Sequence, residues 1–347
     1  MTAAVGQNGV RRSPTMRDVA EAAGVSPTTV SFVINDRAGV GIPDATRSRV
    51  WTAVKQLDYR PNATARHLRT RRSQTIGFVT NGLVDAPFAA DLILGAQDAA
   101  WAREHLLAIA TTDGDPRAEE AAMETLLSRR VDGIIFATSS HRVVTPPAGL
   151  RNLPAVLLNC VCADRSLPSV ALDDVEDGRR ATEVLLRKGH RRIGLIEVVR
   201  PGAQPTGSGR LEGYRQALGA FYARFDESLV HRGDGSAADG YHVVRELMRR
   251  PQPPTAIICG TDEIAMGVYD ALRELRLVIP RDVAVLAFDG RGAIATSLRP
   301  ALSTMALPFA DMGRWAAGYL TDHLDHPMPL PAVQQTIASP FVERASV

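Results

Sequence analysis

The stretch VSPTTVSFVIN, Val25–Asn35, is rich in β-branched residues yet carries the signals that begin a helix. Valine, threonine and isoleucine are mediocre helix formers because their branched side chains restrict χ1. In contrast, Ser26 is a good N-cap, and Pro27 suits the first turn, where its missing N–H is not needed. Apolar residues then recur at helical spacing, at Val30, Val33 and Ile34. We therefore expect a short helix whose valines pack inward and whose small hydroxyl groups face outward.

The segments on either side of this stretch are also predicted to be helical. Thr15 is a good N-cap with Asp18 three residues later, as in a capping box, and Gly24 ends that first helix. After the stretch, apolar residues at i, i+4 and i+7 predict a third helix, at Val50, Val54 and Leu57. Two helices joined by a tight glycine turn, with a third closing the core, are typical of a helix-turn-helix domain. We place this domain at residues 14–60, after a disordered arm at residues 1–13.

The charge of the chain is unevenly distributed. Residues 1–73 hold 12 Lys and Arg against five Asp and Glu, a net +7, whereas the remaining residues hold 28 against 33, a net −5. A basic head on an acidic body indicates that the head meets a polyanion. On charge alone, a merely soluble basic surface remains the alternative.

Two segments of the head, TMRDVAEAAGVSPTTVSFVIN (15–35) and TRSRVWTAVKQLDYRPNATARHLR (46–69), resemble the DNA-binding head of the LacI/GalR family of bacterial regulators. In that family the second helix reads bases, so the resemblance assigns base reading to Pro27, Thr28 and Phe32. It assigns mainly phosphate contacts to Ser26, Thr29, Ser31 and Asn35. Phosphate contacts position the head, whereas base contacts specify the sequence.

Three residues depart from the family pattern. Phe32 stands where many members carry a polar reader; it cannot bond guanine in a bidentate manner but can contact a thymine methyl. Pro27 lacks a backbone donor, so we expect weak hydrogen-bond readout and a larger contribution from DNA deformation. The alternative for Phe32 is partial burial in the core of the head. Pro43 replaces the usual serine cap of the third helix, which leaves the start of that helix open.

The segment at residues 61–73, PNATARHLRTRRS, is short, basic and without an apolar face. By itself it would be a plain linker. The resemblance implies a hinge helix that forms on operator DNA against its dimer mate, with Ala65, Leu68 and Arg69 at the minor groove. Leu68 would wedge between base steps and kink the duplex.

The body, residues 74–347, alternates short apolar runs with helical patterns. The runs are QTIGFVT, LLAIATT, VDGIIFAT, PAVLLNC, SVALDD, RRIGLIEV, TAIICGTD, DVAVLAFDG and LSTMALP. Such runs separated by helices predict buried parallel strands, and nine of them predict two α/β lobes. The expected fold is therefore a small all-α helix-turn-helix head on an α/β two-lobe body with parallel sheets. The resemblance implies a periplasmic-binding-protein-like body that holds its ligand between the lobes.

Polar residues that follow strands are the candidates for effector binding, because open α/β sheets bind ligands beyond the carboxyl ends of their strands. They are Phe88, Asp91, Asp173, Arg210, Asp262 and Asp289, together with the apolar Ile258. By resemblance, Arg210 is the arginine that grips ligand oxygens, and Ile258 stands where several members stack an aromatic ring. Isoleucine has no π-face, which disfavours a stacked purine. The alternatives are helix caps, from Asp262 for the helix that follows it and from Asp173 or Asp174 for theirs.

No enzyme motif emerges. The segment GSGRLEG lacks the spacing of a dinucleotide loop. His323 and His326 are two histidines without further candidate ligands nearby in the sequence, which is more typical of a solvated helix end than of a metal site. Three cysteines, Cys160, Cys162 and Cys259, make neither a disulfide scaffold nor a zinc set. We expect no catalytic residue, metal or cofactor. A solute-binding or sugar-processing protein is the alternative class, and the complete head motifs and missing secretory signal weigh against it.

The expected function is a DNA-binding transcriptional regulator, most simply a repressor. Its expected partners are a pseudo-palindromic double-stranded DNA operator, a small-molecule effector that is a sugar or related polar metabolite, and a second copy of the chain in a homodimer. No apolar run approaches the roughly 18 residues of a membrane-spanning helix. We expect the protein in the cytoplasm, associated with the nucleoid.

Overall fold

The computed structural model describes residues 14–35, 41–59, 72–81, 88–198, 209–290 and 292–347. The chain forms two compact units, residues 1–73 and residues 74–347. The predicted arm at residues 1–13 and the hinge residues Ala65, Leu68 and Arg69 lie outside the described residues.

The head contains three helices, α1 (Met16–Ala23), α2 (Pro27–Ile34) and α3 (Asp44–Gln56). The predicted capping box is confirmed, because Thr15 N donates to Asp18 Oδ2 at 2.7 Å and Thr15 Oγ1 accepts from Asp18 N at 3.4 Å. Gly24 ends α1 with a φ of 63°, in the left-handed region that suits glycine. These local signals fix where α1 ends and α2 begins.

The core of the head explains why the β-branched residues of α2 are helical. Val30 and Val33 are 0% and 1% exposed and pack against Val19 of α1 and Val50 of α3. Burial of these side chains outweighs their weak helix propensity. At the start of α3, Pro43 gives no side-chain cap, and its carbonyl oxygen instead accepts from the backbone of the first turn.

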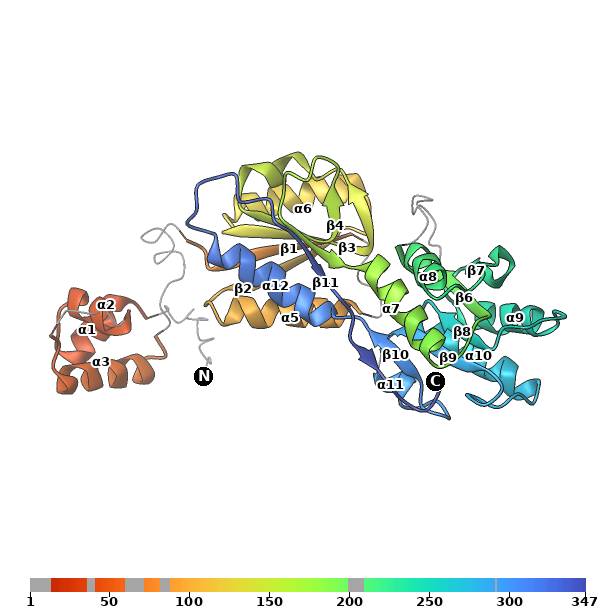
Figure 1. The fold of residues 1–347 in the computed structure, drawn as a ribbon. Coiled ribbons are helices and arrows are strands. Elements are labelled where there is room, and N and C mark those ends of the chain that lie inside the picture. The colour runs from red at the N-terminus through yellow and green to blue at the C-terminus, as the bar shows by residue number, and fades with distance from the viewer. Residues whose placement is uncertain (1–13, 36–40, 60–71, 82–87, 199–208, 291) are drawn as a thin grey trace, which may run out of the picture. The chain divides into compact units, whose positions relative to one another are not determined.

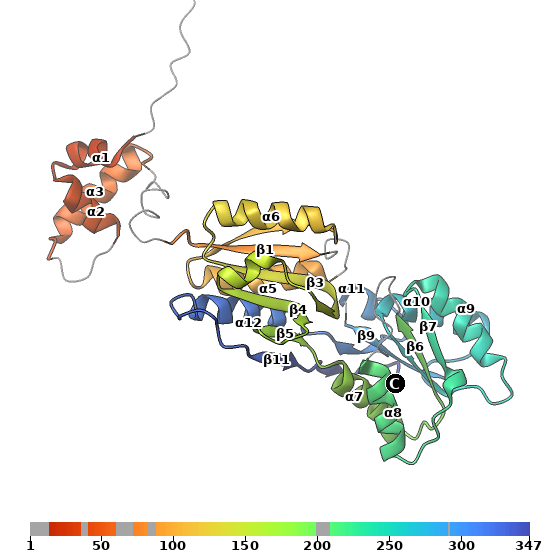
Figure 2. The ribbon, with the colours of Figure 1, turned by 90° about the horizontal axis from the view of Figure 1, so that it is seen from above.

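The N-terminal lobe of the body is built on a six-stranded parallel sheet in the order β11-β5-β4-β3-β1-β2. The strands are β1 (Thr75–Asn81), β2 (Leu106–Thr111), β3 (Gly133–Val144), β4 (Ala155–Cys162), β5 (Ser169–Leu172) and β11 (Gln334–Ile337). One face is covered by α5 (Ala89–Trp101) and α12 (Phe309–Asp322). The other is covered by α6 (Pro116–Ser128) and η1 (Ala148–Asn152). Figures 1 and 2 show these three layers.

The C-terminal lobe repeats this arrangement with the order β12-β10-β9-β8-β6-β7, in which only β12 is antiparallel. The strands are β6 (Ile193–Val198), β7 (Val230–Gly233), β8 (Ala256–Cys259), β9 (Ala284–Asp289), β10 (Ser303–Ala306) and β12 (Phe341–Val342). One face is covered by α7 (Asp174–Arg187) and α8 (Gly209–Ala220), the other by α9 (Ala237–Met248) and α10 (Asp262–Glu274). Two short helices, η2 (Glu227–Leu229) and α11 (Gly292–Ala295), lie in connections.

The chain passes between the two sheets three times, after β5, after β10 and after β11. The predicted two-lobe α/β class with mainly parallel sheets is confirmed, and all nine apolar runs are strands. Three further strands, β7, β11 and β12, were not predicted from the sequence. All three strands are short and lie at sheet edges. Strands β7 and β11 carry polar residues and β12 has only two residues, so none forms the apolar run that marks a buried strand.

The described helices include none with the length and apolar character needed to cross a membrane. Within the same residues, no three His, Cys, Asp or Glu side chains are grouped as metal ligands would be.

Helices α7 and α8 cross with their backbones in contact. A Cβ atom on Gly213 would lie 2.0 Å from the carbonyl oxygen of Val175, and one on Gly178 would lie 2.2 Å from the carbonyl oxygen of Arg210. Only glycine permits such a close approach of two helix backbones. The crossing therefore fixes the position of Arg210 relative to α7.

Replacing Gly213 by Ala is expected to lower the free energy of unfolding of the body by about 1–3 kcal/mol or more, because the new methyl group meets backbone that cannot rotate away. Gly219→Ala in the same helix is a matched control, since nothing lies within 4 Å of the added Cβ. That control should stabilise by up to about 1 kcal/mol through helix propensity. Urea denaturation measures both. Equal effects would show that the helix crossing does not require glycine.

Candidate DNA-recognition helix and ligand site

Helix α2 has one buried and one open side. Val30 and Val33 face the core, whereas Ser26, Pro27 and Thr28 are exposed at its beginning. Thr29, Ser31 and Phe32 are partly exposed, and Asn35 is exposed. All seven predicted DNA-contacting residues of the head therefore retain accessible surface.

The hydroxyl groups on this open side are organised by local hydrogen bonds. Ser26 Oγ accepts from Thr29 N at 3.1 Å and lies 2.9 Å from Thr29 Oγ1. Asn35 Nδ2 donates to the Ser31 carbonyl oxygen at 2.6 Å. These bonds hold the polar groups at the first and last turns of α2, where a DNA backbone running along the helix would meet them.

Phe32 is the largest side chain on this side of α2. It is half-buried, and the cluster of apolar residues that forms the head's core does not include it. The alternative of burial within the core is therefore only partly realised. A half-exposed ring at this position offers apolar area to a thymine methyl group.

In the body, Arg210 of α8 is held by three elements of the C-terminal lobe. Its Nε donates to Asp174 Oδ1 at 3.1 Å, and its Nη1 donates to the carbonyl oxygen of Gly260 at 3.1 Å. Its guanidinium carbon lies 4.0 Å from the centroid of the Phe288 ring. The side chain is 18% exposed. These contacts preorganise a cation at the carboxyl ends of β8 and β9.

Asp174 also connects this cation to the N-terminal lobe. Its Oδ2 lies 3.8 Å from Nδ1 of His141, which belongs to β3. Burial raises the pKa of Asp174, but the hydrogen bond with His141 and the charge of Arg210 outweigh it and leave the pKa below its usual value. Asp174 therefore stays ionised. The sequence indicates Asp174 only as a possible helix cap. It does not indicate His141, which lies within an irregular stretch of the β3–β4 pairing, between Ala137 and Arg142.

Asp262 and Asp289 lie together at the same edge of the sheet. Asp289 ends β9 with a φ of 103°, and its Oδ2 accepts from Asp262 N at 3.4 Å. Asp262 is fully buried, and Thr261 caps α10 in its place by accepting from Ile264 N. The capping alternative for Asp262 is therefore wrong. The structure brings Arg210, Asp262 and Asp289 to one edge of the C-terminal sheet.

Three other predicted residues do not join this group. Asp173 is the N-cap of α7 and accepts from Glu176 N at 3.1 Å, which is the alternative that we had left open for it. Phe88 stacks on Phe309 with ring centroids 4.0 Å apart, and Asp91 is exposed in the first turn of α5. Both belong to the N-terminal lobe.

The structure places Ile258 in the apolar core and not at the predicted ligand site. Its side chain is 1% exposed and packs in the core between the sheet and helices α7 and α8. A side chain without accessible surface cannot contact a ligand in this structure. The sequence position alone did not reveal to which face of β8 the side chain points.

Glu197, at the end of β6, is a further charged residue at this edge that we had not predicted. It is 4% exposed, and its Oε2 lies 3.7 Å from Nε of Arg232 on β7. Burial raises the pKa of Glu197 to about 7, although the charges of Arg232 and Arg210 lower it. Its place at the end of an apolar run was a readable signal, because the sheet order reverses between β6 and β8.

Replacing Glu197 by Gln is expected to remove a pH dependence of stability. The folded chain keeps this proton up to about pH 7, whereas the unfolded chain loses it near 4.5. The free energy of unfolding therefore falls as pH rises through this window, by up to about 3 kcal/mol. Urea denaturation of both proteins at about pH 5 and about pH 8 measures the difference. Parallel pH profiles would contradict the assignment.

Comparisons with known proteins cover both units. Residues 15–62 match the family model described as bacterial regulatory proteins, lacI family. Residues 73–329 match the model described as periplasmic binding proteins and sugar binding domain of LacI family. These two matches take in the described head and nearly all of the two-lobe body.

Whole proteins align over almost the full length. The HTH-type transcriptional repressor PurR of Proteus mirabilis is 32% identical over 313 residues, which cover 89% of this chain and 90% of that protein. The ribose operon repressor of Escherichia coli K12 is 32% identical, covering 92% and 95%. The crystal structure of the lac repressor dimer bound to operator and the anti-inducer ONPF superimposes with a TM-score of 0.74 at 25% identity, covering 96% and 99%.

The family model of the body matches well over half of the chain, and the relatives exceed 30% identity over almost all of it. Members of this family are regulators and not enzymes. The chain therefore belongs to the LacI family of bacterial regulatory proteins, as a DNA-binding transcriptional repressor that an effector modulates.

Proposed function

We propose that two copies of this chain bind a pseudo-palindromic operator in the cytoplasm, on the nucleoid, and repress transcription there. A sugar or related polar metabolite bound by the body changes their affinity for the operator. The observation that carries this proposal is the open side of α2, on which a capped helix presents hydroxyl groups and one aromatic ring away from a valine core.

Base reading falls to Pro27, Thr28 and Phe32, and phosphate contacts fall to Ser26, Thr29, Ser31 and Asn35. The hydroxyl of Thr28 is the one hydrogen-bonding group among the three base readers, since Pro27 and Phe32 have no polar side-chain atom. Thymine methyl contacts should therefore weigh more than bidentate hydrogen bonds in the recognised sequence. We propose the same domain limits as expected from the sequence: an arm at residues 1–13, a head at residues 14–60 and a body at residues 74–347.

The segment at residues 61–73 acts as a hinge in this proposal. Ala65, Leu68 and Arg69 meet the minor groove, with Leu68 inserted between base steps. Unstacking a step costs a few kcal/mol, which the added contacts of the bent duplex offset.

An apolar surface on the N-terminal lobe supports pairing of two chains. Leu94 and Trp101 on α5 are 59% and 68% exposed, and Leu106 and Ile109 on β2 are 54% and 49% exposed. Large apolar side chains exposed on a helix and on an edge strand of the same lobe are typical of an interface. Strand β2 lies at the edge of its sheet. The relative bound to operator is described as a dimer. A homodimer with twofold symmetry would place two heads on one palindrome.

The effector site is proposed at the carboxyl edge of the C-terminal sheet, around Arg210 and Asp289. The fully buried Asp262 would support Asp289 through its backbone N–H, and Asp173 caps the start of α7 nearby. Guanidinium and carboxylate groups together bind hydroxyl groups by donating to some oxygens and accepting from others. Phe88 and Asp91 would add contacts from the N-terminal lobe. No cofactor or metal takes part.

Selection of bound duplexes from a random pool, at about 150 mM salt to suppress nonspecific phosphate binding, tests the DNA-binding proposal. We expect a pseudo-palindrome with thymine-rich half-sites. Phe32→Ala should weaken binding to the selected sequence by about tenfold or more and leave random duplex unaffected, because one base contact is worth about 1–3 kcal/mol. A single half-site would contradict the dimer, and equal losses on both duplexes would remove Phe32 from base reading.

Replacing Arg210 by Ala is expected to abolish the response of operator binding to its effector. Titration of the operator complex with a panel of pentoses and hexoses, beginning with ribose, measures this response in the wild type and the variant. Arg215→Ala is the matched control, because Arg215 lies on the same helix but pairs with Glu227. An unchanged response in the Arg210 variant, or an equal loss in both, would exclude Arg210 from the effector site.

A further inference from the structure

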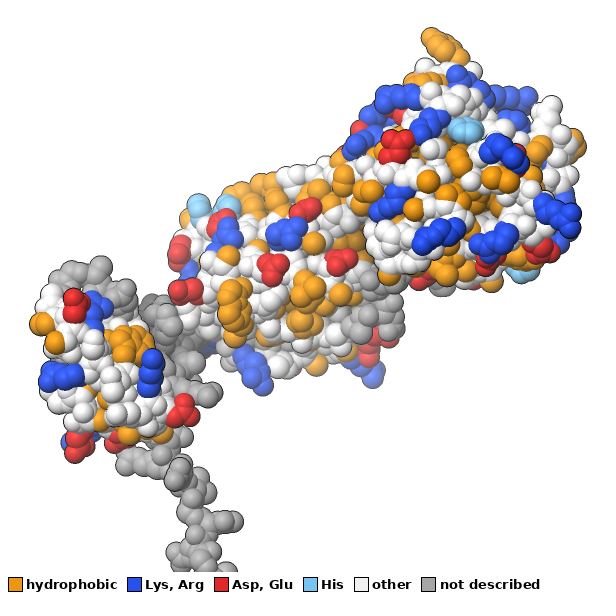
Figure 3. Space-filling view, turned by 90° about the horizontal axis from the view of Figure 1, so that it is seen from below, with side chains coloured by type: hydrophobic (Ala, Val, Ile, Leu, Met, Phe, Trp, Pro, Cys, Tyr) orange, Lys and Arg blue, Asp and Glu red, His pale blue; other side chains and the backbone are white. Residues whose placement is uncertain are grey.

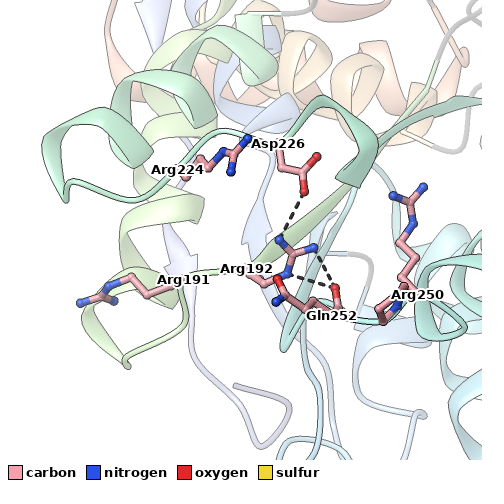
Figure 4. A pocket seen from close by; sticks show the side chains of 7 residues that line it. Arg191, Arg192, Arg224, Asp226, Arg250 and Gln252 are labelled. Carbon is pink, nitrogen blue, oxygen red and sulfur yellow. Dashed lines mark hydrogen bonds and ion pairs between the residues drawn. The ribbon is translucent and has the colours of Figure 1, made fainter.

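A second cluster of arginines lies at the opposite edge of the C-terminal sheet from Arg210. A hollow of about 460 Å³ is lined by Arg191, Arg192, Arg224, Asp226, Arg250, Pro251 and Gln252. All these residues precede strands: two lead into β6, two into η2 and β7, and three into β8. The hollow is therefore at the amino ends of the strands, whereas the proposed effector site is at their carboxyl ends. Figure 3 shows basic side chains gathered over the C-terminal lobe, and Figure 4 shows this hollow.

The one carboxylate among the lining residues, Asp226, already has partners for both of its oxygens. Asp226 Oδ1 accepts from the backbone and hydroxyl of Ser228 at 3.1 and 2.6 Å, and Asp226 Oδ2 accepts from Arg192 Nη1 at 3.3 Å. Arg192 also donates from Nε and Nη2 to the carbonyl oxygen of Gln252 at 3.0 and 2.7 Å. Arg192 is thus fixed at the centre of the hollow, and both oxygens of Asp226 already accept hydrogen bonds.

The remaining guanidinium groups are not neutralised by the described residues. Arg191 donates to the carbonyl oxygens of Leu186 and His190, which carry no net charge. Arg224 and Arg250 make no side-chain hydrogen bond or ion pair within the described part of the chain. In Figure 4 they lie on opposite sides of Arg192. Four arginines against one aspartate leave the hollow with a net charge of +3.

We propose that this hollow binds a small molecule that carries two or more phosphate groups. Arginine forks bind phosphate oxygens in a bidentate manner, and the unpaired groups of Arg224 and Arg250 supply two such forks. A ligand with linked phosphates can reach both, with Arg192 between them, whereas one phosphate group cannot balance the charge. The volume falls within the range of about 300–1,000 Å³ that is typical of small-molecule sites. A concave site of this size suits a compact ligand better than a duplex.

The proposal is independent of the operator and of the effector at the carboxyl edge. The phosphates can belong to an inorganic polyphosphate or to a nucleotide, and both share the chemistry that the hollow recognises. Titration of the full-length protein with tripolyphosphate and with adenosine triphosphate separates the two sources. Equal affinities indicate that the hollow contacts phosphates alone, and tighter binding of the nucleotide indicates an added contact to its organic part; both support the site.

Calorimetric titration of the double variant Arg224→Gln, Arg250→Gln tests the site. We expect tripolyphosphate to bind about tenfold or more weakly than to the wild type, because hydrogen bonds to charged groups are lost. The control is Arg117→Gln, Arg129→Gln, which removes the same charge from exposed positions of the N-terminal lobe. It should bind as the wild type does. The basic head is the same in all three proteins, so its own attraction for polyanions cancels.

Equal weakening in both double variants would overturn the proposal, because it would indicate only a general loss of positive charge. Unchanged binding in the Arg224, Arg250 variant would overturn it as well. So would a variant that loses affinity for random duplex DNA but not for tripolyphosphate, since the surface would then serve a macromolecule. An unchanged melting temperature without ligand shows that the variant is folded. The double variant Arg224→Lys, Arg250→Lys, which keeps the charge without the fork, should retain only part of the wild-type affinity.

Discussion

The contact between the backbones of α7 and α8 is the constraint on which the proposed effector site depends. Because Gly178 and Gly213 have no side chains, the two helices approach until only backbone separates them. This approach sets Arg210 beside Asp174 at the beginning of α7. A longer side chain at either glycine would move the arginine from its partner. The packing of two helices thus determines where the lobe places the partly buried guanidinium group of Arg210.

The same helix α7 connects the ligand edge with the passages between the lobes. Asp177 is fully buried and accepts from the backbone and hydroxyl of Ser339, which lies between β11 and β12 in the third passage. Asp174, three residues earlier, contacts Arg210 on one side and His141 of the N-terminal lobe on the other. A ligand that draws Arg210 away from Asp174 therefore acts on the helix that holds this passage. Coupling between effector and operator must act reciprocally, typically by about 1–3 kcal/mol.

The sequence predicted local features well and packing directions poorly. The caps at Thr15 and Ser26 were readable because a cap depends on neighbours along the chain. The edge strands β7, β11 and β12 were not readable from the sequence, because a strand at the edge of a sheet can form without a run of apolar residues. Ile258 shows the limit for the site: its place in a buried strand was predicted, but the face to which it points depends on the register of that strand within the sheet. His141 and Asp174 meet only because the chain crosses between lobes.

The open side of α2 implies how the head divides its binding energy. Pro27 and Phe32 offer no hydrogen-bond donor to bases, and the hydroxyls of Ser26 and Thr29 already lie within bonding distance of each other. Few donors are left to read base edges, so most of the affinity must come from phosphate contacts and from the shape of the DNA. Of these, only the phosphate contacts form equally with a duplex of any sequence. In the proposed binding mode, discrimination between sequences would then depend on apolar contacts to thymine and on how easily the centre of the site bends, so the proposed hinge at residues 61–73 would contribute to specificity beside α2.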